Sequence, residues 1–209
     1  MITSYKQLPV GLYLEICNVS QDEKLDELSK QVRVLALLSG MTDDQVLNMP
    51  IADYQKAVVA SSFLHREYEP TGRVASSYKV GGFDLRPFKD WTKMTAAQFI
   101  DYQTYSSKGT EAHVVEIVSV VLVPAGMKYG DGYDVADVQR AVRDNLCVSD
   151  VLDIVAFFFS QYGAFLVDSL TYLKRQAEKM KKGPEREARL KEIAMLETRL
   201  LSLGAGYTT

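Results

Sequence analysis

The chain has 209 residues, of which 47% are hydrophobic and 24% charged, and its formal net charge is −3. A chain of this length and composition is typical of a soluble globular protein with one or two domains and a real hydrophobic core. Because the molecule is slightly negative, it has no overall electrostatic attraction to nucleic acid.

Two features of the sequence concern its compartment. Residues 1–7 contain no basic region that leads into an apolar segment, so the sequence predicts no signal peptide. Cys17 and Cys147 form no CxxC pair, which favours a reducing environment with both thiols as small core residues. We therefore expect the protein in a cytoplasm.

Residues 1–70 form the first predicted helical repeat. Apolar residues recur here at three- and four-residue steps, and such steps predict amphipathic helices. We place these helices at 22–38, 43–48 and 52–64. Gly40 is suited to the left-handed residue that ends the first helix, Thr42 to the cap of the second, and Pro50 to the opening of the third.

Residues 71–93 contain a predicted β-hairpin that links two helical repeats. Gly81 and Gly82 can adopt the positive φ angles of a two-residue turn. This turn would pair Val80 with Phe83, Lys79 with Asp84, and Tyr78 with Leu85. The apolar members of these pairs share one face. Because an isolated two-stranded hairpin is marginal in water, we expect that face to pack on another part of the protein.

Residues 94–148 form the second predicted helical repeat. Helices are predicted at 96–105, 112–123 and 135–146. Thr95 can cap the first of these helices and Asp134 the third. The β-branched residues at 117–123 leave both helix and strand open for that stretch, and its alignment with a helix of the first repeat favours helix.

The two repeats match in sequence. Residues 51–58 and 135–142 are identical at five of eight positions, and each differing pair is either apolar or basic. Upstream, the same order relates 34–41 to 120–127 and 8–15 to 94–101. A duplicated helical module without shared catalytic residue types favours a surface for partners over a reaction centre.

Residues 149–209 have no counterpart in the first repeat. We predict a long helix to about residue 182, a break at Gly183 and Pro184, and a final helix over 185–203 that folds back as a helical hairpin. The apolar stripe of the final helix consists of Leu190, Ile193, Leu196, Leu200 and Leu203. Aromatic residues around more than one face of the long helix predict burial on several sides, within the fold or between subunits.

The most apolar stretch, 151–173, also has the length of a membrane span. Asp153 and Asp168 interrupt it, and a carboxylate near the centre of a bilayer costs about 2.5–3.5 kcal/mol. We therefore predict no membrane span and favour a buried helix or an oligomer contact.

The sequence contains no recognisable catalytic or metal-binding motif. His65 and His113 are the only histidines and belong to no metal-binding spacing. The loop at 130–134 offers too few oxygens for a calcium site. Asp53 and Asp137 recur in the first turns of two helices, where the helix dipole favours a negative charge without any function. We expect no enzyme, no catalytic residue, no metal and no cofactor.

Residues 174–191 carry a local basic excess, with eight Lys and Arg against three Glu. A phosphate-binding tip built from Lys181, Lys182 and Arg186 is the alternative hypothesis, that of a nucleic-acid-associated protein. The acidic residues are interleaved with the basic ones and no aromatic residue accompanies them, so we favour a solvated turn.

Two stretches of the chain resemble phage tail-assembly chaperones and related virion-assembly proteins. They are VRVLALLSGMTDDQVLNMPIADY at 32–54 and MTAAQFIDY at 94–102, the second preceded by the hairpin sequence YKVGGFDL. The resemblance covers about 8–64 and 78–142. It implies a non-enzymatic protein that binds other virion components, in the host cytoplasm or incorporated into the virion.

We therefore predict a mainly α-helical protein with two related helical repeats bridged by a β-hairpin and followed by a C-terminal helical hairpin. The leading hypothesis is a phage assembly chaperone or structural protein that binds other virion components, or further copies of itself, through apolar helix faces. The residues predicted to contact partners are aromatic: Phe157, Phe158, Tyr162, Phe165, Tyr78 and Phe83.

Overall fold

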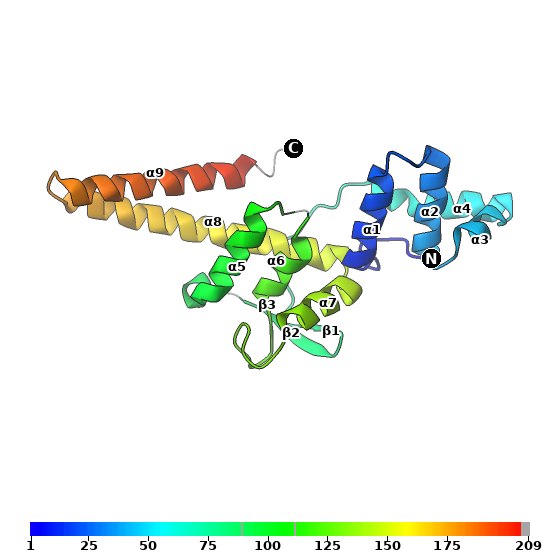
Figure 1. Cartoon of the computed structure of the whole chain (residues 1–209), viewed down its shortest axis with the longest axis horizontal. Coiled ribbons are helices and arrows are strands. Elements are labelled where there is room, and N and C mark those ends of the chain that lie inside the picture. The colour runs from blue at the N-terminus through cyan, green and yellow to red at the C-terminus, as the bar shows by residue number, and fades with distance from the viewer. Residues whose placement is uncertain (89, 111, 206–209) are drawn as a thin grey trace. The chain divides into compact units, whose positions relative to one another are not determined.

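The computed structural model describes residues 1–88, 90–110 and 112–205 (Figure 1). The described chain is mainly α-helical, with a small antiparallel sheet between helical segments and two long helices at its C-terminal end. This architecture confirms the predicted fold class. The chain divides into two compact units, which are Met1–Phe88 with Thr95–Val155 (unit 1) and Lys89–Met94 with Ala156–Thr209 (unit 2).

The first repeat folds into four α-helices and a 3-10 helix. These are α1 (Val10–Gln21), α2 (Glu27–Ser39), α3 (Asp43–Leu47), α4 (Ile51–Ser61) and η1 (Ser62–His65). Gly40 ends α2 with a φ of 69°, and Thr42 forms a reciprocal capping box with Gln45, as the predicted helix ends require. α2 begins later than the predicted residue 22, because the Asp26 carboxylate accepts the Ser29 N–H and caps the helix there.

The repeat encloses two small groups of buried apolar side chains. One contains Leu8, Ile16, Leu38 and Val148, and the other contains Val32, Leu35, Ala36 and Val46. Helix α2 contributes to both groups, so it links α1 on one side to α3 and α4 on the other. Val148 belongs to helix α8 (Val148–Lys179), so the start of that helix is part of unit 1.

A three-stranded antiparallel sheet follows, built from β1 (Tyr78–Val80), β2 (Phe83–Pro87) and β3 (Leu122–Pro124). The β1–β2 register is the predicted one, with Tyr78 opposite Leu85, Lys79 opposite Asp84 and Val80 opposite Phe83. Gly81 and Gly82 both have positive φ angles, as the predicted turn requires. The β-hairpin was expected to pack on another part of the protein, and part of that packing is the pairing of β2 with β3. Strand β3 was not predicted as a strand of this sheet.

The second repeat contains α5 (Ala96–Ser107), α6 (Val114–Val121) and α7 (Val135–Asn145). Thr95 and Asp134 cap α5 and α7 as predicted. At 117–123, where helix and strand were both open, the chain is helical to Val121 and forms strand β3 from Leu122. The strand is selected by its pairing with β2, a contact between distant parts of the sequence.

The helix bounds agree with the alignment of the two repeats. α1 and α5 each contain 12 residues, α4 and α7 each contain 11, and both pairs begin and end at aligned positions. The packing order also recurs, because α2 packs on α1 and α4 while α6 packs on α5 and α7. The middle elements differ, since α2 continues to Ser39 whereas the aligned part of the second repeat becomes β3.

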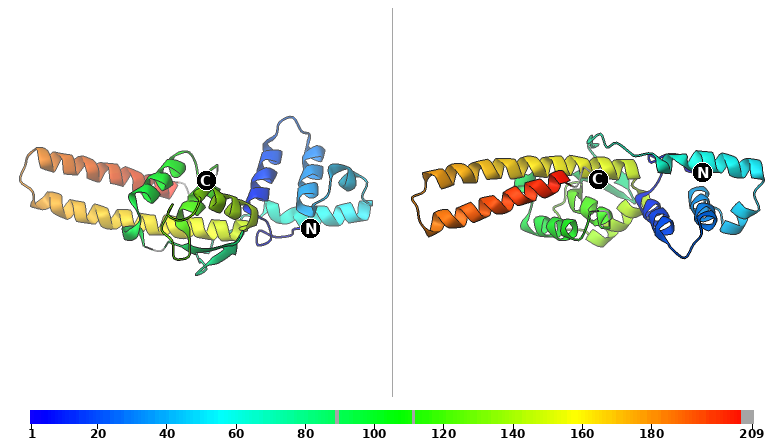
Figure 2. Two further views of the ribbon diagram at one scale, coloured as in Figure 1. Left: turned by 60° about the horizontal axis from the view of Figure 1, so that its bottom comes forward. Right: turned by 90° about the horizontal axis from the view of Figure 1, so that it is seen from above.

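Unit 2 contains the 3-10 helix η2 (Trp91–Lys93), α8 from Ala156 onward and α9 (Pro184–Ala205). Helices α8 and α9 run side by side in opposite directions (Figure 2), which confirms the predicted helical hairpin. Leu173 and Ala177 pack on Ile193 between them, with Leu170 and Leu196 beside this contact. The side chains of Leu200 and Leu203, which we assigned to the apolar stripe, lie outside the described ones.

The compact units follow different bounds from the four predicted segments. The segment 1–70, most of the hairpin segment 71–93 and all of the segment 94–148 except Met94 belong to unit 1, whereas Trp91 and Met94 belong to unit 2. The predicted segment 149–209 begins inside unit 1, because Leu152 packs against the α1 core.

Candidate partner-binding surfaces

Two of the aromatic residues predicted to contact partners are buried on α8. Phe158 is only 2% exposed, and Tyr162, one helical turn further on, is also buried. Both rings lie against the ring of Trp91, with centroid distances of 6.3 Å and 4.9 Å. Burial of this kind makes Phe158 and Tyr162 part of the core of unit 2. Their predicted role in binding has no support from this placement.

Phe165 occupies a different environment on the same helix. Its ring stacks on Trp91 with a centroid distance of 6.5 Å and an interplanar angle of 20°, yet the residue remains 36% exposed. Phe157 is partly buried and packs edge-on against Phe158, with centroids 5.2 Å apart. Of the four aromatic residues predicted on α8, Phe165 is therefore the one that is exposed.

The two predicted residues of the hairpin are used mainly within the fold. Tyr78 is buried, and its hydroxyl oxygen accepts the N–H of Ala75 at 3.0 Å. Burial raises the pKa of the Tyr78 phenol above its ordinary value of 10.0. Phe83 is partly buried. Tyr78 and Phe83 belong to unit 1, whereas the four predicted aromatic residues of α8 belong to unit 2.

The exposed apolar side chains of unit 2 extend along both of its long helices. Tyr172 is 61% exposed and lies seven residues, about two helical turns, after Phe165, so both occur on the same side of α8. Further exposed apolar residues of this unit are Val167 on α8 and Leu190 and Met195 on α9. Val167 lies two residues after Phe165 and therefore on the opposite side of α8. We call the other four residues, which are Phe165, Tyr172, Leu190 and Met195, the hairpin surface. The sequence periodicity alone did not identify Tyr172, Leu190 or Met195 as exposed.

The basic turn between α8 and α9 is partly engaged inside unit 2. The Arg186 guanidinium donates through Nε to the Ala177 carbonyl oxygen at 3.3 Å, near the C-terminal end of α8. Cationic side chains at such an end satisfy open carbonyl groups and interact favourably with the helix dipole. Lys181 and Lys182 are exposed. Of the three residues in the predicted phosphate-binding tip, Arg186 thus has a structural use.

Asp153 is the most highly hydrogen-bonded carboxylate of unit 1. Its Oδ1 accepts the N–H groups of Thr71 and Gly72, at 2.5 Å and 3.1 Å, and the Thr71 hydroxyl at 2.9 Å. Its Oδ2 accepts the Tyr68 hydroxyl at 3.1 Å. These bonds attach the segment 66–77 to the first part of α8. Sequence analysis treated Asp153 only as an interruption of an apolar stretch.

A pocket of about 710 Å³ lies between α1, α2 and η1. It brings Cys17 and His65 to one cavity, although they are far apart in sequence. In the described part of the chain these two side chains share no hydrogen bond, so the pair lacks the geometry of an activated thiol. Sequence reasoning had no signal for this proximity, because it arises from the packing of η1 near α1.

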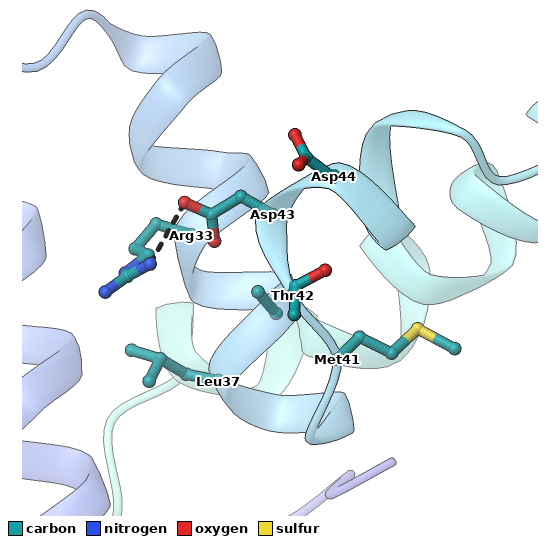
Figure 3. A pocket seen from close by; sticks show the side chains of 7 residues that line it. Arg33, Leu37, Met41, Thr42, Asp43 and Asp44 are labelled. Atoms are coloured by element: carbon teal, nitrogen blue, oxygen red, sulfur yellow. Dashed lines mark hydrogen bonds and ion pairs between the residues drawn. The ribbon is translucent and has the colours of Figure 1, made fainter.

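A second pocket, of about 540 Å³, lies beside the turn from α2 to α3 (Figure 3). Two of its charged groups form an ion pair, because the Arg33 guanidinium lies 3.0 Å from the Asp43 carboxylate. Both partners are substantially exposed, so this ion pair contributes little to stability.

Within the described residues, no group of three or more His, Cys, Asp or Glu side chains could hold a metal ion. Helix α8 is long and apolar enough to span a membrane by length and composition alone. The absence of a membrane span therefore stays a prediction.

No protein-family model, curated protein or solved structure matches the chain.

Proposed function

We propose that this chain is a non-enzymatic protein that binds other proteins through apolar helix faces, and that its partners are components of a phage particle or of its assembly intermediates. The hairpin surface carries the first part of this proposal. The second part comes from the resemblance of 32–54 and 94–102 to virion-assembly proteins.

The hairpin surface has the properties of a binding surface because its exposed side chains are not needed to hold α8 and α9 together. That task is performed by Leu173, Ala177 and Ile193, which are buried between the helices. Phe165 and Tyr172 are therefore free to lose their remaining contact with water on binding a partner. Full burial of a large apolar side chain contributes about 1.5–3 kcal/mol.

Phe165 is the best anchor on this surface. Its stack on Trp91 restricts the ring before any partner arrives, so little side-chain entropy is lost on binding. Aromatic residues with this combination of rigidity and exposure often dominate the energy of an interface. A partner that offers an apolar pocket or an apolar helix face would fit this anchor.

The proposal is tested with the proteins encoded by the genes next to that of this chain. Purified candidates are titrated against the full chain by isothermal calorimetry, and then against Phe165→Asp and Tyr172→Asp. We expect each variant to lose about 2 kcal/mol of binding energy, or about 30-fold in Kd.

Leu28→Asp is the matched control for this experiment. Leu28 is 62% exposed, about the same as Tyr172, but it lies on α2 of unit 1. An aspartate in the first turn of a helix is also compatible with the helix dipole. Equal affinity of Phe165→Asp, Tyr172→Asp and wild type for every partner would refute the role of the hairpin surface. Partners outside virion assembly would refute only the phage setting.

A further inference from the structure

Helix α4 exposes more apolar surface than its counterpart in the second repeat. Ile51 and Val59 are 70% and 72% exposed, and no residue of α4 is fully buried. In the aligned helix α7, Val138, Ala141 and Val142 are buried. The residue of α7 that aligns with Val59 is Arg143, a side chain suited to solvent.

Helix α7 is covered in part by α1 of the first repeat. The approach is close at Gly11, where an added Cβ would lie 2.7 Å from Arg143 Cγ and 2.9 Å from the Arg143 carbonyl oxygen. The Val10 N–H donates to the Leu146 carbonyl at 2.9 Å at the same contact. Leu14 lies three residues after Gly11, on the same side of α1. Within this chain, the first helix of one repeat therefore packs on the last helix of the other.

Helix α5 is the counterpart of α1 in the second repeat, and the aligned sides of the two helices face the interior of the protein. Ile16 of α1 and the aligned Tyr102 of α5 are both buried. The other side differs in exposure. Ala97, which aligns with Gly11, is exposed, and Ile100, which aligns with the half-buried Leu14, is 60% exposed.

The exposed face of α4 thus corresponds to the face of α7 that contacts α1, and the exposed face of α5 corresponds to the face of α1 that contacts α7. Figures 1 and 2 show α4 and α5 apart in unit 1. We propose that copies of this chain associate head to tail, with the Ala97 and Ile100 side of α5 in one copy packed on the Val59 side of α4 in the next. This inference uses unit 1 and does not rest on the function proposed for the hairpin surface.

The contact between copies is looser than the one inside the chain. Ala97 has a Cβ where Gly11 has none, so the two helix axes lie further apart. The backbone hydrogen bonds that Leu8 and Val10 make with 146–148 are not repeated, because the aligned residues 62–64 lie in η1. Association therefore depends on side-chain contacts and on protein concentration.

The two faces are different surfaces, so the contact is heterologous. Such a contact leaves one free face at each end of every assembly, which grows until it closes into a ring or continues as a filament. Because the two faces differ, a variant altered on one face can still pair with a variant altered on the other face. In a symmetric dimer contact, the two variants could not complement each other in this way.

The test compares wild type with Val59→Glu and Ile100→Glu by sedimentation velocity, from about 1 µM to about 1 mM. Glutamate is used because Arg143, the residue of α7 that aligns with Val59, itself lies at the contact with Gly11, so an arginine at position 59 would not remove the proposed contact. Wild type is expected to form dimers and larger assemblies as the concentration rises, whereas each variant alone stays monomeric. An equal mixture of the two variants is expected to form a 1:1 dimer and nothing larger, because only one pair of intact faces remains. Circular dichroism confirms that both variants are folded.

Leu28→Glu is the control, because Leu28 is an exposed apolar residue of α2, which is neither of the two helices in the proposed contact, and this variant is expected to assemble like wild type. The inference is overturned if wild type stays monomeric over the whole range, or if either single variant assembles like wild type. It is also overturned if the mixture of variants stays monomeric or forms assemblies larger than a dimer.

Discussion

Asp153 shows how one side chain fixes a segment that has no regular structure. The segment 66–77 gains order from the hydrogen bonds that Tyr68, Thr71 and Gly72 donate to this carboxylate. Two of the donors are consecutive backbone N–H groups, and Gly72 has a φ of 64°, so the backbone forms a small anion-binding concavity for Asp153.

Replacement of this carboxylate is expected to destabilise unit 1. Asp153→Ala leaves its donors without their charged acceptor and should lower the free energy of unfolding by about 2–3 kcal/mol. The measurement is urea denaturation, with Asp168→Ala as the control, since Asp168 is an exposed aspartate of the same helix. A loss of the same size in both variants would show that the bonds to Asp153 do not stabilise the fold.

The carboxyl group of Asp150, close to Asp153 in sequence, is expected to make the free energy of unfolding depend on pH. Burial raises the pKa of Asp150 above its ordinary value of 3.8, the charge of Asp153 raises it further, and Lys6 acts in the opposite direction. Because the folded pKa is above the unfolded one, the ionised form is disfavoured in the fold. Its destabilising effect is complete above the raised pKa and disappears as the pH falls below 3.8.

Asp150→Asn removes this titration. At neutral pH the variant should be slightly more stable than wild type, and the difference should vanish below the ordinary pKa of 3.8. Urea denaturation at a series of pH values measures the difference. An advantage of the variant that stays constant or grows toward low pH would contradict the assigned direction.

At the scale of elements, the hairpin depends on two glycines with different surroundings. Both have positive φ, but a Cβ at Gly81 would lie 2.6 Å from the Ala141 Cβ, whereas a Cβ at Gly82 would meet nothing within 4 Å. We expect Gly82→Ala to cost about 1 kcal/mol for its φ angle. Gly81→Ala should cost about 3 kcal/mol, because a clash with α7 is added. Equal losses in denaturation experiments would mean that the turn does not press on α7.

Helix α8 supplies a second matched pair of residues. Phe158 is buried, so Phe158→Ala should lower the free energy of unfolding by about 3–5 kcal/mol. Phe165 keeps part of its ring in water, and Phe165→Ala should cost about 1 kcal/mol. Thermal or urea unfolding of the two variants shows whether each phenylalanine belongs to the core or to the surface. A loss at Phe165 as large as that at Phe158 would remove Phe165 from the hairpin surface.

Local features of the sequence predicted local structure well. The Gly81 and Gly82 turn fixed the register of β1 and β2, and Thr42, Thr95 and Asp134 marked helix starts that the structure confirms. Each of these features acts through hydrogen bonds or φ angles within a few residues, so the sequence window around it contains the necessary information.

Contacts between distant residues could not be predicted in this way. Strand β3 exists because Leu122 and Val123 lie beside β2, and the Asp153 hydrogen bonds join residues more than 80 positions apart. The difference between Phe158 and Phe165 likewise depends on how each meets Trp91 and the rest of the fold. Aromatic content alone therefore did not predict which residues of α8 are exposed.

At the scale of the whole molecule, the proposed function requires the hairpin surface to become buried in a complex. Hydroxyl-radical footprinting of the full chain, alone and bound to its partner, measures this burial directly. We expect Tyr172 and Met195 to be oxidised much more slowly in the complex, while Met41 in unit 1 is oxidised at an unchanged rate. Unchanged oxidation of Tyr172 and Met195 together with protection of Cys17 and His65 would contradict the proposal and place binding in the pocket of unit 1 instead.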